Sequence, residues 1–294
     1  MGLSLAELVR WLVRASVFAN VAALGARSKP GDTLLVLRAW DQLLRAFVAM
    51  QVILPVCTVL LVQALHLSPP VKIALVALSV SPVPPLMPRK ASGVQSVEAY
   101  AIGLLTAMAV ASLLWVPIAL EILERVFDVP LQLTALTVGL IVLQTVVLPL
   151  GVGILLRRLA PRAAEKLVRP ALAVGGALLL LGMVVIVVAA HATLGQLLGD
   201  GTLAAVIAWT ALGLAVGHWL GGPDPARRAV LAVATSSRHP AVAIAIAQQN
   251  FPDQKLAPAA VLLALLANVF VTSAYVAWVK RKARVGFTAE ARAR

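Results

Sequence analysis

Apolar residues fall in long blocks along most of the chain, and short polar stretches separate these blocks. Each block is about twenty residues long, the length of α-helix that crosses a hydrocarbon layer roughly 30 Å thick. Such blocks must be helical, because lipid offers no partner to an unpaired backbone N–H or C=O group. The pattern predicts an all-α membrane protein with about nine transmembrane helices. The predicted spans lie near residues 6–25, 42–65, 68–97, 99–122, 130–157, 167–190, 203–220, 226–251 and 256–279.

Lysine and arginine gather in alternate connections between these spans. Connections rich in lysine and arginine lie in the cytoplasm of bacterial membrane proteins. The distribution therefore predicts a multi-pass protein of the cell inner membrane, with its N-terminus outside and its C-terminus in the cytoplasm. An odd number of spans requires the same arrangement. The basic residues concerned are Arg27, Lys29, Arg38, Arg157, Arg158, Arg162, Lys166, Arg169, Arg227, Arg228, Lys280, Arg281, Lys282 and Arg284.

The composition supports the membrane assignment and narrows the partners. Hydrophobic residues make up 61% of the chain and charged residues 13%, whereas soluble domains have about 45–50% and about 25%. Because the net charge of +13 is concentrated in connections, we expect contact with lipid head groups and not with nucleic acid. The single cysteine, Cys57, excludes disulfides within the chain and cysteine metal clusters. Nothing in the sequence indicates a protein partner or an organic cofactor.

Two of the predicted spans contain prolines and polar residues near their middles. Each proline in a helix interior removes a backbone donor and costs about 3 kcal/mol. The third span has four prolines within seven residues, followed by two basic residues. The eighth has five polar residues, 235–239, directly before Pro240. The residues of these two breaks that we predict to bind substrate are Pro88, Arg89, Lys90, Ser236, Ser237, Arg238 and His239.

Irregular backbone at membrane depth is tolerated only where it is buried in protein or lines a cavity. A charged side chain there normally faces a polar pathway. Paired broken helices in corresponding positions of two halves are typical of the central site of a transporter. The alternative, for either break taken alone, is a proline kink without a functional role.

The order of several short motifs resembles the bile acid:sodium symporter family, in a bacterial nine-helix variant. These motifs include Gln51-Val52-Ile53-Leu54-Pro55, Leu148-Pro149-Leu150-Gly151 and Ala241-Val242-Ala243-Ile244-Ala245. The resemblance implies two inverted repeats whose unwound helices cross near the membrane centre, and a panel domain beside a core domain. It divides the chain into a truncated first repeat (residues 1–129, helices 1–4), a second repeat (130–280, helices 5–9) and a cytoplasmic basic tail (281–294).

The second break departs from the family pattern that the resemblance implies. That pattern, Glu-x-x-x-Gln-Asn, helps to bind sodium, and here Ala234, Arg238 and His239 occupy its three positions. Gln51 and Thr106 match other positions of the family's cation sites. Since a guanidinium replaces oxygen ligands, we predict that sodium is not bound. Arg238 either acts as a tethered cation at carbonyls and helix ends or binds an anionic substrate directly.

These features predict a sodium-independent secondary transporter of a small organic anion. The alternatives are a sodium-coupled symporter with altered ligands, a channel, or a non-transporting sensor on the same fold. His239 is a candidate proton carrier, because free imidazole has a pKa near ~6.5. An enzyme is not expected, since no H-E-x-x-H or G-x-S-x-G motif occurs and the hydrophobic centres of the spans hold no carboxylate. No catalytic residue or metal ligand is predicted.

Overall fold

The computed structural model describes residues 5–27, 40–83, 95–129, 131, 135–197, 199 and 201–292. Its elements within these ranges are α-helices and two short π-helices, without a strand, which confirms the all-α prediction. The elements are α1 (Leu5–Arg27), α3 (Trp40–Phe47), η1 (Val48–Ile53), α4 (Leu54–Ala64), α5 (Pro69–Val80), α6 (Gln95–Phe127), α7 (Ala135–Val142), η2 (Leu143–Val147), α8 (Leu148–Leu159), α9 (Pro161–Leu197), α10 (Thr202–Leu220), α11 (Pro225–Ser236), α12 (Pro240–Asn250) and α13 (Ala257–Arg292).

Six helical stretches among the described residues are long and apolar enough to cross a membrane. The predicted spans near 6–25 and 167–190 coincide with α1 and α9, which are not among the six, and the third span contributes the shorter apolar helix Pro69–Val80. The total of nine spans and the inverted repeats therefore stay predictions. The six stretches are Trp40–Ala64, Tyr100–Phe127, Leu136–Leu159, Thr202–Leu220, Pro225–Asn250 and Ala257–Lys282.

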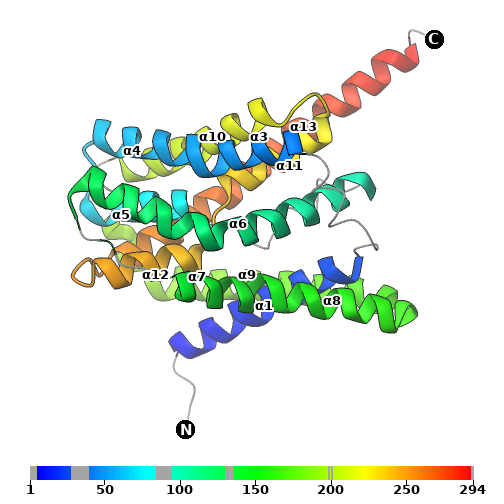
Figure 1. The fold of residues 1–294 in the computed structure, drawn as a ribbon, viewed down its shortest axis with the longest axis horizontal. Helices are drawn as coiled ribbons and strands as arrows, with labels where there is room; N and C mark the ends of the chain where they lie inside the picture. Colours follow the sequence, from blue (N-terminus) through cyan, green and yellow to red (C-terminus); the bar gives the residue numbers. More distant parts are fainter. Residues whose placement is uncertain are drawn as a thin grey trace.

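The helices form two groups that lie side by side. Helix α1 packs along α8 and α9, which together we call the α1–α8–α9 group. The second, which we call the crossing group, contains η1, α4, α5, α10, α11, α12 and α13. Figure 1 shows the α1–α8–α9 group along the lower side of the molecule and α4, α10, α11 and α13 along the upper side. Helices α6 and α7 contact each other where the groups meet.

Glycines allow close approach of helices within both groups. A Cβ atom on Gly153 of α8 would overlap the carbonyl oxygen of Ala22 in α1, and one on Gly25 would overlap that of Leu150. Gly213 of α10 faces the last residue of α11: a Cβ atom on Gly213 would lie 2.7 Å from the Cα of Ser236. Lipid provides no hydrophobic drive for helix association, so small residues that bring backbones together supply much of the packing energy.

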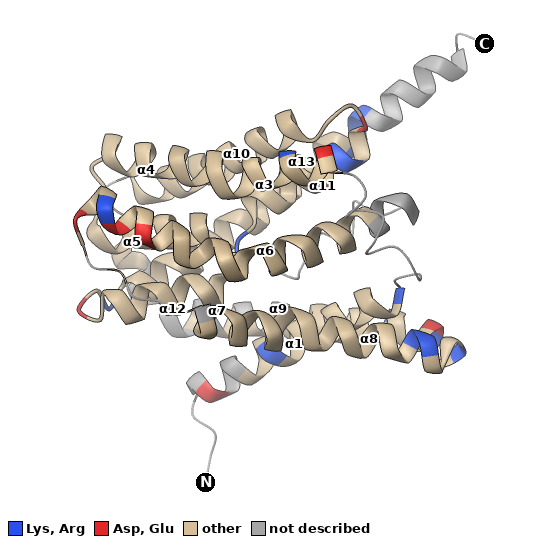
Figure 2. Cartoon of the chain, viewed as in Figure 1, with Lys and Arg blue, Asp and Glu red and all other residues tan. Residues whose placement is uncertain are grey.

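Charged side chains lie at the ends of the bundle. Figure 2 shows lysines and arginines at the connection between α8 and α9 and on α13 just before its grey end, both at the same end of the bundle. The last turn of α8 contains Arg157 and Arg158. Between the ends, large apolar side chains such as Leu114, Leu136 and Val188 are exposed on the outer surface. An apolar belt between charged ends is what a lipid-embedded protein requires.

The helix boundaries differ from the expected ones in two places. Residues 95–97, which we assigned to the end of the third span, belong to α6, so the fourth helix begins earlier than predicted. Helix α13 continues to Arg292 without a break at residue 279, so the predicted basic tail is an extension of the last helix. No glycine or proline stands at residues 97–99 or 279–280, where we placed these boundaries, and apolar patterning alone cannot place a helix end.

Candidate functional site

The two predicted breaks meet in the interior of the crossing group. Helix α5 ends at Val80, and Ser81 is extended, with φ −68° and ψ 151°. Helix α11 ends at Ser236, and α12 begins at Pro240. The backbone N–H of His239 donates to the carbonyl of Pro82 over 2.9 Å. The eighth span is therefore unwound where the sequence predicted, and α5 ends where the first predicted break begins. We call residues 81–83 and 237–239 the crossing region.

Arg238 joins three elements at this point. Its side chain is only 3% exposed. Nη1 donates to the carbonyl of Ser81 over 3.1 Å, and Nη2 donates to the carbonyl of Met50 in η1. The end of a helix carries partial negative charge on its unpaired carbonyls. The guanidinium therefore balances the partial negative charge of two carbonyls at once, one at the C-terminal end of α5 and one in η1.

The carbonyl of Met50 is available because Pro55 follows η1. The N–H of Leu54 donates five residues back, to Ala49, in the pattern of a π-helix. The next donor in that pattern would be residue 55, which is a proline and has no N–H. Met50 therefore loses its partner within the helix, and Arg238 supplies one. Bulges of this kind are frequent at functional sites.

Asn268 of α13 fixes the end of α11. Its Nδ2 donates to the carbonyl of Ser236 over 2.9 Å, and its Oδ1 accepts from the hydroxyl of Ser237 over 3.2 Å. The hydroxyl of Ser236 donates to the carbonyl of Val233 over 3.0 Å. Both serine hydroxyls that we predicted to bind substrate are thus used within the protein.

His239 links the crossing region to the neighbouring helix group. Its imidazole Nε2 lies 3.0 Å from Oγ1 of Thr145 in η2. Thr145 in turn donates to the carbonyl of Ile141 over 2.6 Å. The side chain of His239 is 4% exposed, and its Nδ1 has no hydrogen-bond partner among the described residues.

The remaining predicted site residues are separated by the structure. Gln51 is 1% exposed and follows Met50, and neither polar atom of its amide has a partner in the described part of the chain. The hydroxyl of Thr106 donates to the carbonyl of Ile102 in its own helix, α6. Ala234 is fully buried in the apolar core. Pro88, Arg89 and Lys90 lie outside the described residues.

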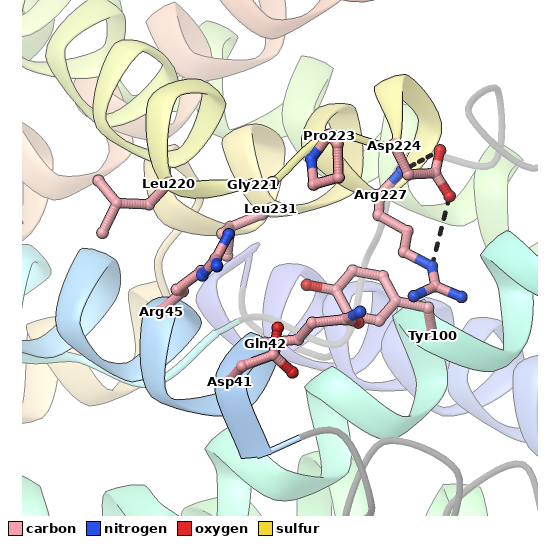
Figure 3. Close-up of a pocket in the computed structure, with 11 residues that line it drawn as sticks. Asp41, Gln42, Arg45, Tyr100, Leu220, Gly221, Pro223, Asp224, Arg227 and Leu231 are labelled. Atoms are coloured by element: carbon pink, nitrogen blue, oxygen red, sulfur yellow. Dashed lines mark hydrogen bonds and ion pairs between the residues drawn. The ribbon is translucent and has the colours of Figure 1, made fainter.

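A pocket opens at the basic end of the bundle, away from the crossing region (Figure 3). Its volume is about 280 Å³. The guanidinium of Arg227 lies 5.8 Å from the centre of the Tyr100 ring and 3.4 Å from the carboxylate of Asp224. Asp41 and Arg45 of α3 line the same pocket, as does Leu231 of α11. Helix α11 therefore runs from this pocket to the crossing region, and its 12 residues span about 18 Å along its axis.

Sequence reasoning did not identify Asn268, Thr145 or the carbonyl of Met50 as parts of the site. Asn268 had a signal, since it is an amide within an apolar span. The signal for Met50 was Pro55, whose missing donor must leave one carbonyl of the preceding turn unpaired. Thr145 had no local signal, because threonine commonly bonds to the preceding turn of its own helix.

One comparison with known proteins gives a match. The model of the Sodium Bile acid symporter family matches residues 16–197, which is more than half of the 294-residue chain. The matched range extends from α1 through α9, and it includes η1 and the first break. No curated protein matches the chain by sequence. Together with the apolar helices, this match shows that the chain is a membrane protein that belongs to the Sodium Bile acid symporter family.

Proposed function

We propose that the protein is a secondary transporter of a small organic anion, and that the guanidinium of Arg238 takes the place of the family's coupling sodium. The observation that carries this proposal is the pair of hydrogen bonds from Arg238 to the carbonyls of Ser81 and Met50. Carbonyl oxygens are hard ligands of the kind that sodium prefers. Because a fixed positive charge already occupies these oxygens, an added cation at the same place would be repelled.

The same contacts favour the tethered-cation role of Arg238 over direct binding of substrate. Both terminal nitrogens of the guanidinium donate to carbonyls, which leaves Nε without a partner among the described residues. The two hydrogen bonds use two of the five N–H donors of the guanidinium, so a bound carboxylate would share Arg238 with Ser81 and Met50. Nε and the amide of Gln51, which have no partner among the described residues, are further donors for a bound anion.

The expected orientation gives the pocket at the basic end a role in this proposal. If the lysine- and arginine-rich end faces the cytoplasm of the cell that carries this inner-membrane protein, the pocket lined by Asp41, Arg45, Tyr100 and Arg227 is the cytoplasmic mouth. Its arginines would attract an anion, and Asp224 and Asp41 would keep it from binding tightly. Helix α11 leads from there to the crossing region.

The proposal is tested by thermal unfolding of the purified protein in sodium chloride and in choline chloride, with acetate, pyruvate and benzoate as probes. We expect at least one carboxylate to raise the melting temperature equally in both salts, because binding only the folded state stabilises it. Uptake of that carboxylate into proteoliposomes should saturate, which distinguishes a carrier from a channel. Stabilisation in sodium chloride alone would show a sodium symporter with rearranged ligands. Binding without uptake would show a sensor.

Restoring the family pattern should restore sodium binding. The double variant Ala234→Glu, Arg238→Gln restores the carboxylate and the amide of the family pattern and frees the carbonyls of Ser81 and Met50. We expect sodium to raise the melting temperature of this variant relative to choline. The single variant Ala234→Glu is the control: it keeps the guanidinium on both carbonyls, and its melting temperature should not respond to sodium. Equal responses of the two variants would contradict the substitution of sodium by arginine.

A further inference from the structure

The backbone of His239 is held in the crossing group, and its side chain bonds to η2, which contacts the α1–α8–α9 group. The backbone N–H donates to Pro82, which fixes the crossing region. The imidazole reaches Thr145 in η2, which contacts α1 and α8 of the α1–α8–α9 group. The backbone of His239, and not its side chain, joins the two breaks, and the side chain faces η2 at the boundary between the helix groups.

The hydrogen bonds around Thr145 fix the proton of the neutral imidazole. The hydroxyl of Thr145 has one hydrogen, and it donates that hydrogen to the carbonyl of Ile141. Toward His239 the same oxygen must accept, so Nε2 of His239 carries a hydrogen and donates. In the neutral ring, Nδ1 then bears a lone pair. This buried acceptor has no partner in the described part of the protein.

A proton on Nδ1 would place a second positive charge beside Arg238. The described side chains of α5, α7, η2, α12 and α13 provide no carboxylate to balance it. Helix α6, which contacts α11, has described carboxylates at Glu121 and Glu124 in its last two turns, and Glu121 already pairs with Arg125. Helices α7, η2 and α12 have no charged residue, α5 has only Lys72 in its first turn, and α13 has lysines and arginine at 280–282. An unbalanced buried charge is strongly unfavourable. An anion bound at the crossing region would remove that penalty.

We propose that a proton on Nδ1 of His239 and one carboxylate substrate bind the crossing region together, so that the transporter moves an anion with a proton. This inference rests on the proposed function and names its coupling ion. The proton enters from water onto the lone pair of Nδ1, and it leaves the same atom when the anion departs. By reciprocity, the anion must strengthen proton binding by the factor by which the proton strengthens anion binding.

Proton uptake on anion binding tests this inference directly. A pH indicator in weakly buffered detergent solution would follow the addition of acetate, pyruvate or benzoate at pH values between about 5 and 8. We expect about one proton per protein to be taken up with any carboxylate that raises the melting temperature. His239→Gln should bind the carboxylate more weakly than the natural protein and without proton uptake. It should fold, because any residue with a backbone N–H can make the bond to Pro82.

Two further variants separate the role of His239 from general effects. Thr145→Val removes the acceptor of Nε2–H, and we expect the pH of half-maximal uptake to fall by about half a unit to one unit, as for loss of one hydrogen bond. His218→Gln is the matched control. His218 lies at the far end of α10, where its imidazole bonds to Tyr275 of α13, so its replacement should not affect proton uptake.

The possible outcomes are distinct. Carboxylate binding without proton uptake would overturn the inference and leave a sodium-independent anion carrier. Proton uptake that persists in the His239→Gln variant would do the same. If no carboxylate bound in either salt at any of these pH values, the proposed function would fall together with the inference.

Discussion

Replacing Arg238 with glutamine is expected to lower the free energy of unfolding by about 3 kcal/mol or more, because two hydrogen bonds from a charged donor contribute about 1.5–3 kcal/mol each. The carbonyls of Ser81 and Met50 would then be buried without a partner. The shorter amide of glutamine cannot reach both. In thermal unfolding, the loss corresponds to a fall in melting temperature on the order of 10 °C. Transport should be abolished.

Arg228→Gln is the matched control for this variant. Arg228 also donates two hydrogen bonds to backbone, from Nε and Nη2 to the carbonyl of Gly222, over 2.9 and 2.7 Å. That carbonyl lies in the turn before α11, outside the crossing region, so we expect a loss of only about 1 kcal/mol. If Arg238→Gln instead kept the stability of the natural protein and only bound the carboxylate more weakly, Arg238 would be a substrate ligand and the tethered-cation role would be wrong.

Gly153→Ala is expected to destabilise the α1–α8–α9 group by about 3 kcal/mol, near the upper end of the usual cost of overpacking. The added methyl group would overlap the carbonyl of Ala22 and lie 2.7 Å from the backbone nitrogen of Ala26. Both obstacles are backbone atoms of α1, so no side-chain rotation can relieve the contact. The helices would have to separate, which also affects Gly25 across the same interface. Thermal unfolding measures the effect.

Gly151→Ala makes the same chemical change two residues earlier in the same helix. A Cβ atom there would have no neighbour within 4 Å. Because alanine is favoured over glycine in helices by up to about 1 kcal/mol, this variant should be as stable as the natural protein or slightly more stable. Equal losses from Gly151→Ala and Gly153→Ala would mean that α1 and α8 do not pack in the way described.

The sequence was sufficient to predict which spans unwind, because that depends on local backbone chemistry. Prolines alone did not decide it, since α6 and α9 continue through Pro117 and Pro170. In the second break, proline follows polar residues whose side chains and backbone bond to other helices, and the free helix ends find partners there. Residues 84–94, which hold most of the predicted first break, lie outside the described part.

The partners of the site residues could not be predicted, because they come from distant parts of the chain. The guanidinium of Arg238 contacts carbonyls 157 and 188 residues away in sequence, and His239 contacts Thr145 across the helix groups. Gly151 and Gly153 are equally unremarkable in sequence, and only the packing of α1 separates them. The roles assigned to Gln51, Thr106 and Ala234 stay predictions.

Equilibrium binding of radioactive sodium to the purified protein tests the central claim most directly, since it needs no knowledge of the substrate. With Arg238 occupying the carbonyls of Ser81 and Met50, the natural protein should bind no sodium above background. The double variant Ala234→Glu, Arg238→Gln should bind it saturably in the same assay. Saturable, stoichiometric binding of sodium by the natural protein would contradict the claim that Arg238 replaces the coupling ion.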